Sequence, residues 1–290
     1  MTAYSEALEQ QVRMLRLMAG PSGDAYVDAA QPTASPADRR RFRELAVTML
    51  ARAESYFWDQ QLAGVVAEAS ASLPDGTTLV ESMVPSYAGW FWFAQPVELG
   101  QPDFAKIRAI SWLPLDDQSR GGLALQVVWW VHLPDFGTVP AASGPWFLGD
   151  PLDGFEQRRL ASDGPTGPRY VAVMRFLASA FAFVSQGIVT ARPVRAERHA
   201  AKRVAREGWS PEPLIRVIQL RRAERAAHEP SDGSAPREWS CQWVVRGHWR
   251  QQVWGEGRKG RRPIWITPYV KGPDDKPLKT PRATVFAVVR

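Results

Sequence analysis

The segment QVVWWV at residues 126–131 is apolar on both faces of the strand that it predicts. Successive side chains of a strand point to opposite faces of a sheet, so this pattern indicates a central strand that is buried on both sides. Further runs rich in aromatic and β-branched residues occupy 89–93, 107–112 and 123–132, with Gly, Pro and Asp between them. The chain has 13 Trp among its 290 residues, and we expect these runs to form an aromatic-rich antiparallel sheet.

Helices are expected before this sheet. Apolar residues in 4–19 recur at helical spacing along one stripe. A second helix is predicted to begin at Ser35–Asp38, which supplies a capping serine, a proline for the first helical position and an acidic side chain for the first turn. It is predicted to run to about Ala69. Segments 20–35 and 134–168 are rich in Gly, Pro and Asp, and we expect both to be irregular.

Four arginines lie in the first turns of this second helix, namely Arg39, Arg40, Arg41 and Arg43. Positive charge near a helix N-terminus is unfavourable because of the helix dipole, so these four arginines are not explained by helix stability. A solvated helix face is the simpler interpretation, and a separate role for the cations stays open.

Residues Tyr170–Thr190 form the most apolar stretch of the chain. A stretch of about 20 residues is long enough to span a bilayer. Arg175 lies within it and no basic cluster precedes it, which favours a buried core helix over a membrane span. A further helix, which is strongly basic, is predicted over Pro193–Glu207.

The net charge of +6 conceals a division along the chain. Residues 1–185 hold 14 basic and 20 acidic side chains, a net of −6, whereas residues 186–290 hold 22 basic and 10 acidic ones, a net of +12. Asymmetry of this size between two halves indicates an anionic partner for the basic half. A basic surface that serves only solubility is the alternative.

The basic half is predicted to contain the basic helix and then a small β-meander. Spacing of three and four residues places four cations on one face of the helix, namely Arg195, Arg198, Lys202 and Arg206. Short connections make consecutive strands antiparallel neighbours. The strands are predicted at residues 214–222, 239–251, 263–270 and 284–289.

These elements predict an α+β fold with two domains. The first, residues 1–190, would contain the N-terminal helices and the aromatic-rich antiparallel sheet. The second, residues 191–290, would contain the basic helix and the small antiparallel module.

The densest set of candidate binding residues lies at 246–266. Alternation along a strand places Arg246, His248, Arg250 and Gln252 on one face, and arginines and a lysine crowd the turn that follows. Forked guanidinium groups and closely approaching glycine backbone bind phosphates, and exposed aromatic rings stack on unpaired bases. The predicted nucleic-acid-binding residues are the four cations of the basic helix together with Arg246, His248, Arg250, Gln252, Trp254, Arg258, Lys259, Arg261, Arg262, Tyr269 and Lys271.

The motifs of common enzymes are missing from the sequence. It contains no GxxxxGK[ST], GxGxxG, HExxH or GxSxG pattern, and no cofactor is predicted. The single cysteine, Cys241, excludes an intrachain disulfide and a cysteine-ligated zinc site, and we expect no metal site. His248 is a weak catalytic candidate, because no second titrating group accompanies it in the motif. The N-terminus lacks a signal-peptide pattern, so the cytoplasm is the expected location and no membrane is expected as a partner.

Residues 245–273, which contain VRGHWR and RRPIWITPYVKGP, resemble a module found in uncharacterised proteins of actinobacteria, their phages and plasmids. They are more distantly similar to the C-terminal part of a type V-A anti-CRISPR family, which is thought to lower production of its target nuclease by acting on the message during translation. The resemblance implies a mobile-element protein that acts on RNA or at the ribosome. It supplies no catalytic residue.

The sequence therefore predicts a nucleic-acid-binding protein, with RNA favoured over DNA, that acts in gene regulation or mobile-element conflict at the level of mRNA or translation. The N-terminal domain would bind a protein or a nascent peptide. One alternative is a protein-binding inhibitor whose basic surface contacts an acidic protein. Another is a nuclease-like toxin that uses His248.

Overall fold

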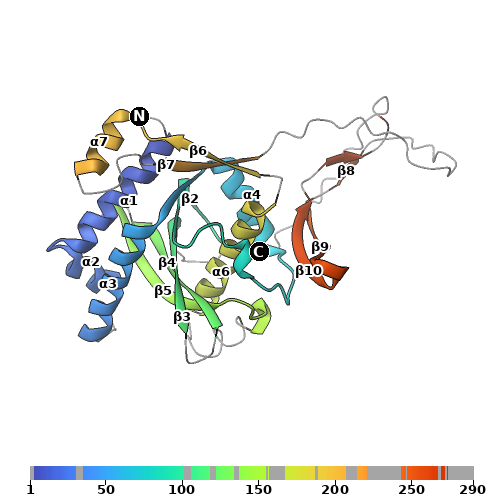
Figure 1. Cartoon of the computed structure of the whole chain (residues 1–290), viewed down its shortest axis with the longest axis horizontal. Helices are drawn as coiled ribbons and strands as arrows, with labels where there is room; N and C mark the ends of the chain where they lie inside the picture. Colours follow the sequence, from blue (N-terminus) through green and yellow to red (C-terminus); the bar gives the residue numbers. More distant parts are fainter. Residues whose placement is uncertain are drawn as a thin grey trace, which may run out of the picture.

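A seven-stranded sheet lies between two layers of helices in the computed structural model of the chain (Figure 1). The residues that the structure describes are 3–30, 35–100, 106–117, 122–133, 137–154, 156, 167–186, 189–206, 214–220, 243–245, 247–266, 269–271 and 273.

The helices of this part of the chain include α1 (Ala3–Ala19), α2 (Gly23–Ala30), α3 (Pro36–Arg52), α4 (Gln60–Ala71), α6 (Gly167–Val184) and α7 (Arg198–Arg206), with the short 3-10 helices η1 (Glu81–Met83) and η3 (Glu256–Arg258). The strands are β1 (Glu54–Trp58), β2 (Gly89–Val97), β3 (Ile107–Asp117), β4 (Gly122–Leu133), β5 (Gly137–Phe147), β6 (Val189–Arg195), β7 (Leu214–Leu220), β8 (Trp243–Val245), β9 (His248–Trp254), β10 (Gly260–Ile266) and β11 (Tyr269–Lys271).

The large sheet is mixed, with the strand order β5-β4-β3-β2-β1-β7-β6. The middle strand β1 runs parallel to both of its neighbours, β2 and β7, and the remaining neighbours pair antiparallel. The connection from β1 to its parallel neighbour β2 passes through α4, as parallel pairing requires a crossover. Outside this sheet, β9 pairs with β10 and β8 pairs with β11, both antiparallel.

The two faces of the sheet bury different aromatic side chains. On β2, Trp90 and Trp92 belong to the apolar cluster shared with α1 and α3, whereas Phe91 and Phe93 belong to the cluster shared with α4 and α6. All four side chains are 0 or 1% exposed. Alternation along one strand therefore explains why the sheet has a helical layer on each face.

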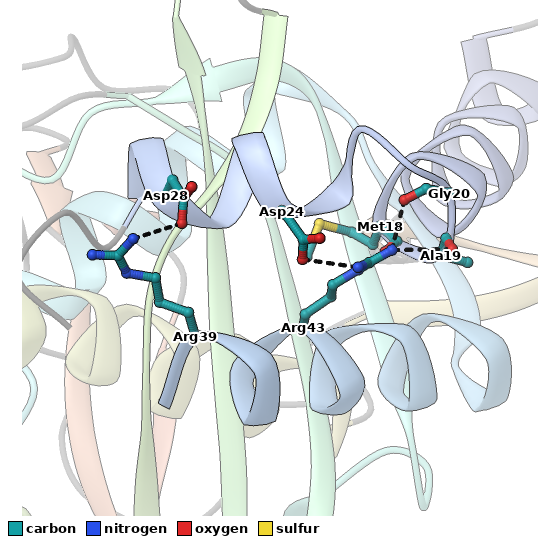
Figure 2. A network of polar contacts seen from close by, with 7 residues as sticks. All are labelled: Met18, Ala19, Gly20, Asp24, Asp28, Arg39 and Arg43. Carbon is teal, nitrogen blue, oxygen red and sulfur yellow. Dashed lines mark hydrogen bonds and ion pairs between the residues drawn. The ribbon is translucent and has the colours of Figure 1, made fainter. Parts of the chain in front are cut away.

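Helices α1 and α3 close each other's C-terminal ends with side chains. The guanidinium of Arg43 donates to the carbonyls of Met18, Ala19 and Gly20 at 2.6, 3.2 and 2.6 Å, and it also pairs with Asp24 at 2.8 Å (Figure 2). These carbonyls lie at the negative end of α1, where a cation is favourable.

The reverse contact is made by Gln11 of α1, which is fully buried. Its side-chain amide donates to the carbonyls of Leu50 and Ala53 at the end of α3, at 2.9 and 2.8 Å, and its oxygen accepts from the hydroxyl of Ser55. Side chains of the facing helix thus satisfy terminal carbonyls at the ends of both helices.

Arg175 of α6 likewise binds carbonyls at the C-terminal end of another helix, α4. It donates to the carbonyl of Ser70 at 3.3 Å and to that of Leu73, both near the end of α4, and its guanidinium pairs with Glu156. A buried core helix is confirmed, since most of α6 is buried, but it ends at Val184, and Val189 and Thr190 belong to β6 instead. No helix within the described ranges is long and apolar enough to cross a membrane.

The predicted α+β fold class is confirmed, as are the first helix and the strands β2, β3 and β4. The prediction of a single helix from Pro36 to Ala69 was wrong, because the buried strand β1 divides it into α3 and α4. Asp59 then begins α4 by accepting a hydrogen bond from the Leu62 amide at 2.8 Å.

Two segments predicted to be irregular contain regular structure. Residues 23–30 form α2, which is held against α3 by an ion pair of 2.7 Å between Asp28 and Arg39 (Figure 2). Residues 137–147 form the strand β5 at one edge of the sheet, where pairing with β4 overrides their content of Gly and Pro.

The basic half also differs in detail from its prediction. Residues 193–195 end strand β6, so the basic helix begins only at Arg198. Strand β7 was assigned to a C-terminal meander, but it pairs parallel with β1 inside the large sheet. The strand predicted at residues 284–289 lies outside the described residues. A division into domains at residue 190 stays a prediction, although β6 and β7 share one sheet with β1–β5.

Replacing Gln11 with leucine should destabilise the fold markedly. The substitution introduces an apolar side chain of similar size but leaves two carbonyls and the Ser55 hydroxyl without their buried partner. Each such loss costs roughly 1–3 kcal/mol, so we expect the free energy of unfolding to fall by about 3 kcal/mol in urea denaturation. The matched control is Gln10→Leu at the half-buried neighbouring position, which should change stability by roughly 0.5 kcal/mol at most. Equal stabilities of the two variants would contradict the capping role.

Candidate nucleic-acid interface

The candidate site is the hairpin of β9 and β10, which projects beyond α6 on the side of the molecule away from α1–α3 (Figure 1). Its strands pair over seven residues each, with Trp249 opposite Trp265 and Gln252 opposite Arg262. At the start of β9, half-buried Trp249 lies between exposed His248 and Arg250, so the hairpin has an inner and an outer face there. The burial does not alternate further along, because Gln251 is exposed and Gln252 is half-buried.

Two tryptophans attach the inner face to the core. Trp249 and Trp265 lie 5.3 Å apart between ring centroids, and each lies 6.0 Å from the ring of Phe183 near the end of α6. The indole N–H of Trp249 donates to the carbonyl of Ala69 in the last turn of α4 at 2.8 Å. The hairpin is therefore docked on both helices of this layer.

The side chain of Gln186 pairs with the free edge of β10. Its oxygen accepts from the Trp265 amide at 3.0 Å, and its nitrogen donates to the Pro263 carbonyl at 3.3 Å. Gln186 is 8% exposed and follows α6 by two residues, so the end of this helix fixes the position of the hairpin. One glutamine amide thus satisfies the backbone groups that a further strand would pair with.

The outer face carries the polar residues that alternation predicted. His248 and Arg250 are exposed and Gln252 is half-buried. Arg250 donates to the side-chain oxygen of Gln252 at 2.7 Å, which orients the guanidinium along the strand. The face is therefore a row of hydrogen-bond donors on a regular backbone.

Trp254 and Arg262 end this row with a stacked pair. The guanidinium carbon of Arg262 lies 3.6 Å from the centroid of the Trp254 ring, well within the range of a cation–π contact. Trp254 is 50% exposed, unlike most tryptophans of this chain, which are buried. A planar cation and a half-exposed indole together form a flat surface that suits a nucleic-acid base.

The turn between the strands concentrates positive charge. Arg258, Lys259 and Arg261 are all exposed, and no ion pair is found for them within the described part of the chain. Residues 247–266 hold five arginines and lysines against one carboxylate, Glu256. Cations that outnumber the carboxylates in this way create a positive potential that attracts anions.

Arg258 adopts a backbone conformation that glycine prefers, with φ at 58°. It follows Gly255 and Gly257, whose φ angles are 81° and 66°, in a turn closed by a hydrogen bond of 3.1 Å from the Arg258 amide to the Gly255 carbonyl. The left-handed region costs a residue with a side chain roughly 1 kcal/mol. The left-handed conformation of Arg258 therefore lowers the stability of the fold slightly.

The predicted binding residues divide into two groups. Helix α7, which carries Arg198, Lys202 and Arg206 on its exposed face, lies at the opposite end of the longest axis from β9 and β10 (Figure 1). Arg195 is exposed at the end of β6 and does not share the helix face that was predicted for it. The structure thus brings the hairpin residues together and leaves the α7 residues elsewhere.

Three further predicted residues have no described side chains. Arg246 lies outside the described residues. Tyr269 and Lys271 belong to β11, where their backbone pairs with Val245 and Trp243 of β8.

A polar cavity of about 290 Å³ lies between α1 and the ends of strands β2–β5. Arg108 lines it, with its guanidinium 4.2 Å from the Trp92 ring centroid and 3.0 Å from Glu6. Burial lowers the pKa of Arg108, and Glu6 opposes this shift. Because this cation is already paired inside the fold, the cavity is less suited to an anion than the hairpin. No group of three or more metal-ligating side chains is found in the ranges that the structure describes.

Gln186 was not singled out by the sequence, although it positions the whole hairpin. A polar residue just after an apolar helix is an ordinary helix end, and its partners Pro263 and Trp265 are almost 80 positions away in the chain. Trp249, in contrast, was predicted to lie on the inner face, and the structure confirms this.

No family model and no curated protein matches the chain. Among solved structures, the crystal structure of AcrVA2 aligns with 92% of this chain and 94% of that chain, at 15% sequence identity and a TM-score of 0.44. AcrVA2 is a type V-A anti-CRISPR protein.

Replacing Arg258 with glycine should separate binding from stability. Glycine accepts the left-handed conformation, so the melting temperature should not fall, whereas affinity for RNA should decrease several-fold and the salt dependence should flatten by about 0.7–0.9 per lost phosphate contact. The control is Lys259→Gly, which also removes one cation but at a φ of −80°, where glycine is unfavourable. That control should lose roughly 0.5–1 kcal/mol of stability. A lower melting temperature in the Arg258 variant would contradict this assignment.

Proposed function

We propose that this chain is an RNA-binding protein whose contact surface is the outer face and turn of the β9–β10 hairpin. Its cellular role would be regulatory or part of mobile-element conflict, at the level of mRNA or translation. The turn supplies phosphate contacts through Arg258, Lys259 and Arg261. The outer face supplies directed donors through Arg250 and Gln252 and a stacking surface at Trp254.

The observation that carries the proposal is the Trp254–Arg262 stack beside the basic turn. Trp254 is half in solvent and contributes little to the core. It contacts Arg262 and lies next to the exposed cations of the turn. Nucleic-acid interfaces combine positive charge with aromatic rings on which bases stack. An acidic protein would satisfy the cations but would not need the flat aromatic surface.

RNA with unpaired bases fits this surface better than a duplex. Stacking on Trp254 requires a base whose face is accessible, and bases inside a duplex are stacked on each other. The outer face also carries amide and imidazole groups at Gln252 and His248, which can form hydrogen bonds with base edges. The preference for RNA over DNA stays a prediction, as does the absence of catalysis at His248.

The first experiment removes the charge of the turn. The hairpin variant, Arg258→Gln, Lys259→Gln and Arg261→Gln, changes three exposed side chains and should stay folded. Affinity for single-stranded RNA should fall at least tenfold, and the slope of log affinity against log salt should decrease by about 2.

The control for this experiment, the α3 variant, removes the same charge from exposed arginines of α3, by Arg40→Gln, Arg41→Gln and Arg52→Gln. It should bind RNA almost as the parent does, because it changes only the net charge. If both variants lose affinity equally, the hairpin is not the contact surface. RNA that is shortened during the parent's binding assay would favour the nuclease alternative.

The second experiment tests stacking. Trp254→Ala should weaken the binding of single-stranded RNA by roughly 1–3 kcal/mol and leave the binding of an RNA duplex almost unchanged. The stability of the protein should not change much, since half of the Trp254 side chain is in solvent. Fluorescence anisotropy with the two RNAs measures both affinities. An equal loss for the two RNAs would show that Trp254 does not contact bases.

A further inference from the structure

A second basic surface lies between α1 and α7, at the end of the molecule away from the hairpin (Figure 1). A groove of about 470 Å³ separates these helices, and Arg13, Arg16 and Arg203 line it. Its remaining charged group is Glu9, and its apolar floor contains Val12 and Val204, which are 7 and 0% exposed.

The packing of α7 makes this surface rigid. Ala200 and Val204 are buried on the inner side of the helix, and the backbone amide of Glu197, just before the helix, donates to the hydroxyl of Ser5 at 3.2 Å. Arg203 is held by an ion pair of 3.2 Å with Glu9, whose side chain is 13% exposed. These contacts therefore hold α7 and the Arg203 side chain against α1.

The acidic groups of α1 are already paired. Glu6 pairs with Arg108 at 3.0 Å and Glu9 pairs with Arg203 at 3.2 Å. Helix α7 itself contains no acidic residue. Arg13 lines the groove, and Lys202 and Arg206 lie outside the lining on the exposed face of α7. The carboxylates of these two helices do not neutralise the charge of these three cations.

The chemistry of the groove favours a phosphate backbone over a protein. Protein interfaces have an apolar centre from which charged residues are depleted, whereas the apolar side chains here are buried in the floor and the walls are arginines. Nucleic-acid interfaces are polar and strongly positive. No described aromatic side chain lines the groove, so it offers contacts to phosphates and none for stacking on bases.

We infer that the α1–α7 groove is a second nucleic-acid contact, which binds the phosphate backbone of single-stranded and duplex RNA alike. Together with the hairpin it makes one chain bivalent, so that the protein bridges two RNA segments. The bridging rests on the proposed function of the hairpin, but the groove can be tested without it.

The test uses a groove variant that removes Arg13 from the groove lining and two cations from the exposed face of α7 next to Arg203, by Arg13→Gln, Lys202→Gln and Arg206→Gln. The Glu9–Arg203 pair stays intact. Its affinity for an RNA duplex should fall at least tenfold, with a decrease of about 2 in the salt slope. The α3 variant, with the same loss of charge, should match the parent. A groove variant that binds duplex RNA with the parent's affinity and salt slope overturns the inference.

Bridging is measured by co-capture. The parent, bound to biotinylated RNA on beads, should retain a second, fluorescent RNA, whereas the groove variant and the hairpin variant should each bind one RNA and fail to retain the other. If the hairpin variant binds single-stranded RNA as tightly as the parent but the groove variant loses duplex RNA, the proposed function of the hairpin is wrong and the groove is still supported. If the groove variant loses binding to polyglutamate but not to RNA, the occupant is an acidic protein and the inference is wrong.

Discussion

The central strands carry large aromatic side chains on both faces, and neither face can be left in water. Trp90 and Trp92 require the layer of α1 and α3, and Phe91 and Phe93 require the layer of α4 and α6. Removing one such buried aromatic side chain costs roughly 3–5 kcal/mol, so both layers are needed for stability. Because α6 must lie on the sheet, its end is fixed in space, and Phe183 and Gln186 there hold the hairpin.

The same layers place positive charge at two ends of the molecule. The hairpin is attached through the α4–α6 layer, and α7 through α1 on the opposite layer. In both places an apolar inner side is buried and the cations are left outside, as Val204 and Lys202 show on α7. Among the described residues after 186, the cations of α7 and those of the hairpin therefore lie on separate surfaces (Figure 1). Under the function proposed above, two separated surfaces would raise the affinity for one anionic polymer through effective concentration.

The sequence predicted those features that depend on local pattern. The apolar run at 126–131 predicted a buried strand, and the alternation of His248, Trp249 and Arg250 predicted which side chains face the core. It did not predict β1, because a five-residue strand that is apolar on most positions also fits the stripe of the preceding helix. Nor could it predict that β7 joins β1 or that Gln186 holds β10, since these contacts join residues far apart in the chain and depend on packing. The division of the site between the hairpin and α7 has the same cause.

The central claim is that RNA lies on the outer face of the β9–β10 hairpin, with a base on Trp254. Ultraviolet crosslinking of the full chain to single-stranded RNA, followed by mass spectrometry of chymotryptic peptides, locates the contact residue by residue. The account predicts crosslinks at Trp254 and in the turn at residues 255–262, which disappear at high salt. Crosslinks confined to the N-terminal helices and the large sheet, with none in the hairpin, would contradict it.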